Sequence, residues 1–263
     1  MLSEVASEKT TTPILAVANQ KGGVGKTTTA INLATILAKE KKILLIDLDS
    51  QGNSSTALGI DYNDRKLGTY QFLINGEVKE GLIKKGIVHN LSLITADANL
   101  AGAELELIEF KKREFRLKKA LSLIKDAYDL ILIDCPPSLG ILTLNALVAA
   151  NGLIVPLQCE FLALEGISHL VKTVGHIQKS LNPNLEIKAI VLTMYDKRNK
   201  LSELVAEDTR SFFGKKVCET VIPRNVRISE AQSYGKPITL YDPKSSGALA
   251  YISLAEELLQ RFC

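Results

Sequence analysis

Short apolar runs recur along the chain and are separated by longer segments with helical spacing. The runs lie at residues 14–18, 43–48, 91–95, 130–133, 153–157, 187–193 and 217–222. Most are continuously apolar instead of alternating, which is typical of strands that are covered on both faces of a parallel sheet. We therefore predict an α/β fold: a doubly wound, mostly parallel sheet flanked by helices on both faces, with ligands at the carboxyl ends of its strands.

The helical spacing is clearest in three segments. Residues 28–39 follow the first apolar run, and residues 247–262 carry an apolar stripe near the end of the chain. A third stripe joins apolar residues between 107 and 124, with a basic run at 111–119 beside it. Such a charge run is usually the solvated face of a helix, and the alternative is an extension of a nucleic-acid-binding patch.

The size and composition of the chain fit one globular domain. It has 263 residues, of which 46% are hydrophobic and 23% charged, and its formal net charge is +3. No Pro/Ser-rich linker divides it, so we expect a flexible tail at residues 1–12 and a single domain over residues 13–263. No apolar run is long enough to span a bilayer, and the N-terminus does not resemble a signal peptide. We predict a cytoplasmic protein with reduced cysteines.

A glycine-rich turn follows the first apolar run and opens into the helical segment at 28–39. Such a turn between a buried strand and a helix N-terminus binds phosphate, because its backbone N–H groups point inward. Lys26 adds a cation, and Thr27 offers a hydroxyl to magnesium. The common spacing G-x-x-x-x-G-K-[ST] requires glycine at position 20, where this chain has Gln20 followed by a second lysine, Lys21. The turn is therefore a variant phosphate loop.

Acidic residues lie at the ends of two further predicted strands. Asp47 and Asp49 are two positions apart at the end of one run, so they point the same way if the chain is extended. Asp134 directly follows the run at 130–133 and is typical of the group that holds magnesium opposite a phosphate loop. A helix cap or a turn is the alternative for any one such residue. Three polar strand ends in this order predict a nucleotide site.

These motifs resemble the ParA/Soj branch of the deviant Walker-A ATPases, which are relatives of MinD. The similarity rests on four segments spread over most of the chain, at residues 21–28, 47–53, 134–138 and 222–227. The first segment, Lys-Gly-Gly-Val-Gly-Lys-Thr-Thr, is highly specific. Ser50 is a small departure, because proline is commoner in the family at this place. The resemblance implies an ATPase with ATP and Mg²⁺ as cofactors.

The resemblance also implies roles for the residues of the variant loop. Lys26 would contact the β- and γ-phosphates, Thr27 would ligate magnesium, and Thr28 would bond the α-phosphate. Lys21 is similar to a signature lysine that crosses a dimer interface to the partner's ATP, and the glycines beside it leave room for close approach. The loop residues expected at the nucleotide are Lys21, Gly22, Gly23, Val24, Gly25, Lys26, Thr27 and Thr28.

Further roles follow from the other matching segments. Asp49 resembles the residue that orients the attacking water, and Asp134 resembles the magnesium-holding group. Asp47 would support the magnesium shell or the lysines. Pro223 and Asn225 resemble the adenine-contacting loop, with a structural turn as the alternative. The expected catalytic residues are Lys21, Lys26 and Asp49, and the expected magnesium residues are Thr27, Asp134 and Asp47.

The DNA prediction rests on basic residues in the last third of the chain. Arg198 and Arg227 lie at positions similar to those with which Soj-like proteins hold duplex DNA without sequence preference, and Arg224 is a further candidate. Such contacts would go to phosphates and would weaken as salt rises. A solvated basic surface is the alternative, because acidic residues are nearly as numerous in this region. The run at 111–119 ranks second.

The resemblance implies a nucleoid-associated ATPase that partitions chromosomal or plasmid DNA. ATP would close a homodimer that binds DNA, and hydrolysis, stimulated by a ParB/Spo0J-like protein, would release it. The alternative is a MinD-like regulator recruited to membranes. The last segment carries Glu256 and Glu257 and lacks a lysine-rich face, so we expect no stable membrane binding. A metabolic enzyme of the same fold would need a substrate or cluster motif, and the sequence shows neither.

Overall fold

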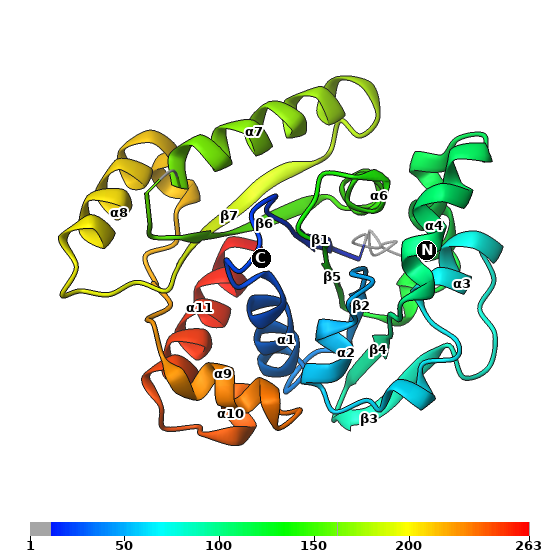
Figure 1. Cartoon of the computed structure of the whole chain (residues 1–263), viewed down its shortest axis with the longest axis horizontal. Helices are drawn as coiled ribbons and strands as arrows, with labels where there is room; N and C mark the ends of the chain where they lie inside the picture. Colours follow the sequence, from blue (N-terminus) through cyan, green and yellow to red (C-terminus); the bar gives the residue numbers. More distant parts are fainter. Residues whose placement is uncertain (1–11, 162, 263) are drawn as a thin grey trace, which may run out of the picture.

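A seven-stranded sheet forms the centre of the protein (Figure 1). The structure is a computed structural model that describes residues 12–161 and 163–262. The strands are β1 (Ile14–Val17), β2 (Ile43–Asp47), β3 (Ile83–Val88), β4 (Leu91–Ile94), β5 (Leu130–Asp134), β6 (Gly152–Gln158) and β7 (Glu186–Thr193). Their order across the sheet is β3-β4-β2-β5-β1-β6-β7, and only the pair β3–β4 is antiparallel. The predicted doubly wound, mostly parallel sheet is confirmed.

Helices cover both faces of the sheet (Figure 1). One face carries α3 (Thr69–Asn75), α4 (Asn99–Glu106), α5 (Arg116–Leu121), α6 (Ile141–Ala149), α7 (Ala163–Ser180) and α8 (Lys200–Phe213). The other face carries α1 (Lys26–Leu37), α2 (Asn53–Ala57), α9 (Val226–Ser233), α10 (Ile238–Tyr241) and α11 (Ser246–Phe262). Within this second layer, α11 packs against α1.

Each face of the sheet contributes to its own hydrophobic core. Along β2, Leu44 and Ile46 belong to the core under α3–α8, whereas Ile43 and Leu45 belong to the core under α1 and α11. All four side chains are fully buried. Burial on both faces explains why such strands read as continuous apolar runs. It also holds the carboxyl ends of the strands firmly at one edge, where their loops can bind a ligand.

The predicted strand at 217–222 is wrong. An isolated bridge between Val217 and Ile190, and hydrogen bonds from Cys218 N and Ile222 N to carbonyls of β7, join this segment to the sheet without a regular ladder. The N–H groups of Glu219 and Thr220 donate to the carboxylate of Glu257 on α11, both at 2.9 Å. Because a side chain takes the N–H groups that a regular ladder would need, the segment crosses the edge of the sheet without becoming a strand.

The seventh strand of the sheet is instead β3, which the apolar pattern did not reveal. It lies at the opposite edge of the sheet, and its register with β4 shifts between Lys85 and Val88. Gly86, inside this irregular stretch, has a φ of 82°, which favours glycine. None of the six residues of β3 is fully buried. An edge strand that is half exposed needs no apolar run, so its sequence gives a weak signal.

The apolar stripe between residues 107 and 124 does not form one helix. The 3-10 turns Leu107–Glu109 and Arg113–Phe115 precede α5, and Lys112 between them has a left-handed backbone with a φ of 56°. Leu117 is nevertheless fully buried in the core, together with other residues of the stripe. The spacing therefore predicted which side chains are buried, but the backbone at Lys112 interrupts the helix.

The predicted tail at residues 1–12 lies outside the described residues except for Thr12. The division of the chain into this tail and a single domain stays a prediction. Among the helices of the described ranges, none combines the length and the apolarity that crossing a membrane requires.

Candidate functional site

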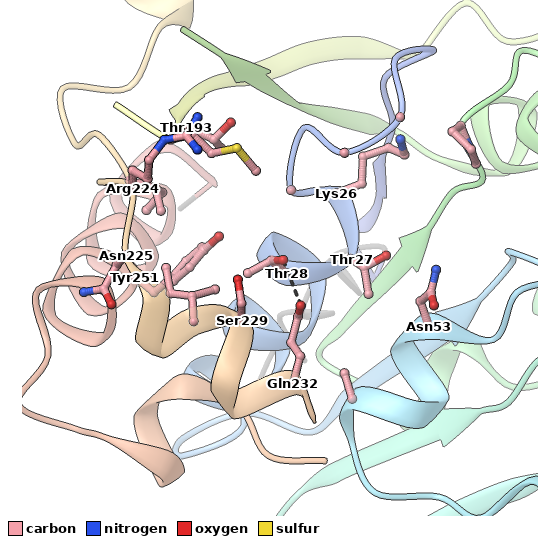
Figure 2. A pocket seen from close by; sticks show the side chains of 18 of the residues that line it. Lys26, Thr27, Thr28, Asn53, Thr193, Arg224, Asn225, Ser229, Gln232 and Tyr251 are labelled. Atoms are coloured by element: carbon pink, nitrogen blue, oxygen red, sulfur yellow. Dashed lines mark hydrogen bonds between the residues drawn. The ribbon is translucent and has the colours of Figure 1, made fainter. Parts of the chain in front are cut away.

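A cavity of about 600 Å³ lies at the carboxyl edge of the sheet. Its walls come from the segments that follow β1, β2, β5 and β7, together with α9 and α11. Figure 2 shows Lys26, Thr27 and Thr28 at the start of α1, facing Ser229 and Gln232 of α9 across the cavity. The three strand ends that the sequence singled out therefore meet at one place, as expected for a doubly wound sheet.

The variant loop joins β1 to α1 and supplies one wall of the cavity. Gly23 and Gly25 have φ values of 74° and 87°, a backbone that side chains rarely adopt. Gly25 is the N-cap of α1, so the first N–H groups of this helix are open to the cavity. Such N–H groups, aided by the helix dipole, bind phosphate. Val24 is buried beneath the loop, and its carbonyl accepts a hydrogen bond from the Thr193 hydroxyl at 2.8 Å.

Lys26 is the cation of the cavity. Its side chain is buried, and its Nζ donates to the carbonyl of Lys21 at 2.8 Å, which arches the loop over the ammonium group. Burial lowers the pKa of Lys26, whereas the carboxylates of Asp134 and Asp49 favour its charged form. A buried ammonium group beside open helix N–H groups is suited to bind phosphate.

Lys21 lies outside the cavity wall and pairs with Glu160, which follows β6. The two side chains are 43% and 34% exposed. Asn19 holds the backbone here, because its Oδ1 accepts from Lys21 N at 3.0 Å while its Nδ2 donates to the carbonyl of Pro156 at 2.8 Å. Gln20, at the place of the expected glycine, donates from its side chain to the carbonyl of Gly166 at 3.1 Å. The loop is thus anchored away from its own cavity at this end.

Asp134 is fully buried at the end of β5 and has one free oxygen. Its Oδ2 accepts from the Ser54 hydroxyl at 2.8 Å, while its Oδ1 has no hydrogen-bond partner among the described residues. Burial raises the pKa of Asp134, and the neighbouring Asp47 carboxylate raises it further, whereas the nearby Thr27 hydroxyl and the hydrogen bond from Ser54 oppose the shift. An unpaired buried carboxylate oxygen beside a threonine hydroxyl is costly unless something binds it.

Asp47 and Asp49 lie at different depths. Asp47 is fully buried, and its Oδ2 accepts from the N–H and the hydroxyl of Ser55 at 2.8 and 2.7 Å. Its Oδ1 accepts from Asp49 N at 3.3 Å. Burial also raises the pKa of Asp47. Asp49 reaches the cavity wall, where its Oδ1 accepts from Gln51 N at 3.0 Å. Asp47 therefore holds the segment that presents Asp49.

The donor set fits magnesium. No cluster of three or more His, Cys, Asp or Glu side chains in the described ranges could hold a metal by itself. Magnesium at a nucleotide site needs fewer protein ligands, because phosphates and waters complete its octahedron. The free oxygen of Asp134, which is buried at the end of β5, and the hydroxyl of Thr27, which lines the cavity, are hard oxygen donors.

The predicted adenine segment forms the far wall of the cavity. Pro223 and Asn225 both line it. The side chain of Asn225 caps α9, because its Oδ1 accepts from Arg227 N at 2.8 Å and its Nδ2 donates to the Ser246 hydroxyl at 2.8 Å. These bonds support the turn that we gave as the alternative role. Adenine contact by Pro223 and Asn225 stays a prediction.

Sequence reasoning missed several cavity residues, namely Asn53, Thr193, Met194, Ser229, Gln232 and Tyr251. Tyr251 lies within the apolar stripe of α11, where it reads as a core residue. It is indeed buried, and its hydroxyl lies 3.3 Å from the Thr29 hydroxyl. Gln232 donates to Thr28 from a helix more than 200 positions away. No local sequence pattern predicts such contacts, because the fold alone brings these segments together.

The three predicted DNA arginines lie on the surface, and two of them, Arg198 and Arg227, form ion pairs. Arg198 pairs with Asp196 at 2.9 Å and lowers the pKa of that carboxyl to about 2, and Arg224 adds to this effect from the cavity wall. The Arg198 side chain is 84% exposed. Arg227 lies in the first turn of α9 and pairs with Glu230 at 2.8 Å. The structure thus groups Arg198 with Arg224 around Asp196, and it places Arg227 on the helix that borders the cavity.

Known proteins resemble the chain over nearly its whole length. A family model described as an AAA domain matches residues 12–187. The chain is 53% identical over 251 residues to the chromosome partitioning protein ParA of Caulobacter vibrioides, with 94% of each chain covered. It is 51% identical over 246 residues to the sporulation initiation inhibitor protein Soj of Bacillus subtilis, which covers 93% of this chain and 97% of the relative.

Solved structures share both the fold and the ligand class. Cobyrinic acid a,c-diamide synthase from Mycobacterium smegmatis, with bound ADP and magnesium, is 36% identical with a TM-score of 0.82 and 95% of each chain covered. A plasmid partition protein of Borrelia burgdorferi bound to AMPPNP is 27% identical with a TM-score of 0.79, covering 95% of this chain and 98% of that one. Because its curated relatives match at about half of all positions, the chain belongs to the ParA/Soj family of chromosome-partitioning ATPases.

Proposed function

We propose that this protein is an ATP-driven switch for partitioning DNA. As a member of the ParA/Soj family it is an ATPase whose cofactors are ATP and magnesium. In the proposed cycle, ATP closes a homodimer, and the dimer binds duplex DNA without sequence preference. Hydrolysis, stimulated by a ParB/Spo0J-like protein, then releases the DNA. This cycle would take place in the cytoplasm, on the nucleoid. Its main support is the cavity with its phosphate loop and buried lysine, together with the Asp134 oxygen that has no partner among the described residues.

The residues in and beneath the cavity have different roles in phosphoryl transfer. The N-terminus of α1 and the Lys26 ammonium group bind the phosphates, where negative charge concentrates during the reaction. Thr27 and Asp134 hold the magnesium ion, which supplies further positive charge to the phosphate oxygens when bound. Asp49, presented at the cavity wall, orients the attacking water. Asp47 supports this arrangement from below through its bonds to Ser55 and Asp49 N.

Lys21 contributes its charge to the partner's nucleotide. It pairs with Glu160 and lies outside its own cavity, so it is placed to act across an interface. An exposed ion pair of this kind contributes only about 0–1 kcal/mol. Lys21 therefore loses little free energy when it leaves Glu160 for a triphosphate bound to a second subunit. The new contact stabilises the dimer, because the phosphates carry more negative charge than one carboxylate.

The exposed arginines form the DNA surface. Their guanidinium groups would exchange carboxylate partners for phosphate oxygens, which they can bind through paired N–H groups. Arg198 and Arg227 carry this role, and Arg224 joins Arg198 beside Asp196. Contacts to phosphates fix the position of a duplex without reading its sequence. This arrangement supports binding to any duplex and a steep dependence on salt.

The membrane alternative has less support. The apolar side chains Leu254 and Leu258 of α11 are buried against the sheet, so this face of the helix is already used inside the protein. Glu257 and Arg261 bond to each other and to the backbone at residues 215–220. An interfacial helix needs a free apolar face. We therefore propose no stable membrane binding.

The ATPase rate, measured with and without its proposed partners, tests this function. We expect slow hydrolysis by the protein alone, a modest rise with duplex DNA, and a large synergistic rise when a ParB/Spo0J-like protein is added with the DNA. Omitting magnesium should abolish the activity. A rate that DNA and the ParB/Spo0J-like protein leave unchanged, alone and together, would refute the partitioning role while leaving the ATPase assignment intact.

A further inference from the structure

One side-chain hydrogen bond ties α9 to the phosphate loop. Gln232, in the last turn of α9, donates from its Nε2 to the hydroxyl of Thr28 at 2.8 Å (Figure 2). Both residues line the cavity, and Thr28 lies in the first turn of α1 beside Lys26 and Thr27. The bond therefore connects the part of the cavity that receives phosphates to a helix from the other end of the chain.

The direction of this bond determines where the Thr28 hydrogen can point. A threonine hydroxyl donates one hydrogen bond and accepts up to two. Since Thr28 accepts from Gln232, its own hydrogen must be directed elsewhere. A threonine inside a helix commonly donates to the carbonyl four residues earlier, which is Val24 here. Among the described residues Thr28 makes no such bond, whereas Thr35 of the same helix donates to the Ile31 carbonyl at 2.8 Å, so the open cavity is the direction left for the Thr28 hydrogen.

The packing of α9 holds the backbone of Gln232 in place. Ala231, next to it, is buried in the core shared with α1 and α11. At the other end of α9, the Asn225 side chain caps the helix and bonds to Ser246 of α11. Because both ends of α9 are fixed, the Gln232 backbone is held next to Thr28, and its Nε2 reaches the Thr28 hydroxyl. Arg227 lies in the first turn of the same helix.

We propose that Gln232 is a positioning residue of the nucleotide site: its amide holds the Thr28 hydroxyl so that the hydroxyl hydrogen faces the phosphates of a bound nucleoside di- or triphosphate. The inference deepens the proposed ATP site and rests on it. It assigns a function to a residue that no sequence motif indicated. It also makes nucleotide affinity depend on the position of α9.

The test compares the affinity for a fluorescent ADP analogue, with magnesium present and DNA absent. Gln232→Leu removes the donor at similar volume and should weaken binding by roughly five- to tenfold, the value of one hydrogen bond to a polar group. Gln232→Glu should weaken it further, because the carboxylate accepts the Thr28 hydrogen and adds negative charge beside the phosphates. Ser233→Ala, next in sequence but exposed, is the matched control and should bind as the wild type does.

A double substitution separates positioning from a general effect on the fold. Thr28→Val removes the hydroxyl, so adding Gln232→Leu to it should cost no further affinity. Melting curves without nucleotide should be alike for the wild type and Gln232→Leu. Equal affinity of Gln232→Leu and the wild type would overturn the proposal, as would an undiminished effect of Gln232→Leu in the Thr28→Val background. If the wild-type protein itself does not bind the ADP analogue, the ATP site is refuted instead.

Discussion

Burial makes each charged residue at or beneath the cavity costly unless it has a partner. Lys26 is kept inside by the Lys21 carbonyl and by nearby carboxylates, whereas Asp134 and Asp47 sit fully buried next to each other. Two buried carboxylates in contact are unfavourable in the absence of a bound cation. We therefore expect the site to be destabilised in the free protein, and magnesium with nucleotide to relieve this cost by binding.

The pKa of Asp134 predicts how its replacement affects stability. The pKa of Asp134 in the folded state is raised above the ordinary value of 3.8. At pH values between the ordinary and the raised pKa, the folded state therefore binds more protons than the unfolded state. Stability is then lost as pH rises through this window, and the loss is complete above the raised pKa. Asp134→Asn removes the buried charge. We expect it to stabilise the nucleotide-free, magnesium-free protein by about 1–3 kcal/mol at pH 8.

Urea unfolding of the wild type and Asp134→Asn at pH 8 and pH 5 measures this effect. The gain should shrink at the lower pH, and the variant should lose its magnesium-dependent affinity for nucleotide. A variant that is less stable than the wild type at both pH values would show that Asp134 acts as a structural hydrogen-bond acceptor for Ser54 and not as a strained metal ligand.

Lys21 gives the sharpest prediction for one residue. Lys21→Ala should leave most of the ADP affinity, because Lys21 lies outside its own cavity. It should abolish the ATP-dependent increase in mass seen by light scattering. Glu160→Gln is the matched control: it breaks the same ion pair but leaves the lysine free, so dimerisation should persist or strengthen. A Lys21→Ala protein that still dimerises with ATP would exclude the role across the interface.

At the scale of secondary-structure elements, buried strands could be predicted from the sequence and edge segments could not. β1, β2 and β5 are covered on both faces, and their apolar runs gave their positions to within a residue. β3 is half exposed at an edge, and the segment at 217–222 gives its N–H groups to Glu257. Local sequence does not encode which polar partner a backbone N–H group will find.

In the candidate site, too, some residues could be predicted from local sequence and others could not. The phosphate loop is continuous in sequence, so Lys26 and Thr27 could be predicted from one motif. Gln232 and Tyr251 reach the cavity from helices near the other end of the chain, where they read as ordinary helical residues. Only the packing of α11 against α1, and of α9 against α2 and α11, brings them to it. For Asn225, the sequence left two roles open, and the structure supports its capping role.

The elements that carry the arginines should bind DNA. Arg198 precedes α8 and Arg227 lies in the first turn of α9, and both side chains are exposed. Changing both to Glu should reduce duplex affinity at least tenfold at moderate salt and lower the salt dependence of what remains. Nucleotide-dependent dimerisation should be unchanged. An electrophoretic shift assay over several salt concentrations measures the loss.

A matched control for this pair is the double change of Lys84 and Lys85 to Glu. These lysines lie on β3, at the sheet edge opposite β7, so the change in net charge is the same but the surface differs. This control should bind DNA nearly as the wild type does. Equal losses in the two variants would show that binding follows net charge and not the surface formed by Arg198 and Arg227.

At the scale of the whole molecule, we expect dimerisation to couple ATP binding to DNA binding. One subunit offers few arginines and a net charge of only +3, so we expect it to bind a duplex weakly. Joining two subunits rigidly would make the second set of phosphate contacts intramolecular, which would raise the affinity without any new kind of contact. In the proposed cycle, ATP shared between two cavities through Lys21 triggers this step, and hydrolysis returns the protein to the weakly binding form.

Occupancy of an immobilised, non-specific duplex tests this coupling most directly. The wild type is measured with ATP and magnesium, with ADP and magnesium, and as Asp49→Ala with ATP, while light scattering reports its mass under the same conditions. We predict a DNA-bound dimer with ATP, an unbound monomer with ADP, and a dimer of Asp49→Ala that leaves the duplex much more slowly because its hydrolysis is impaired. Equal occupancy with ATP and ADP, or DNA binding by a monomer, would contradict the account.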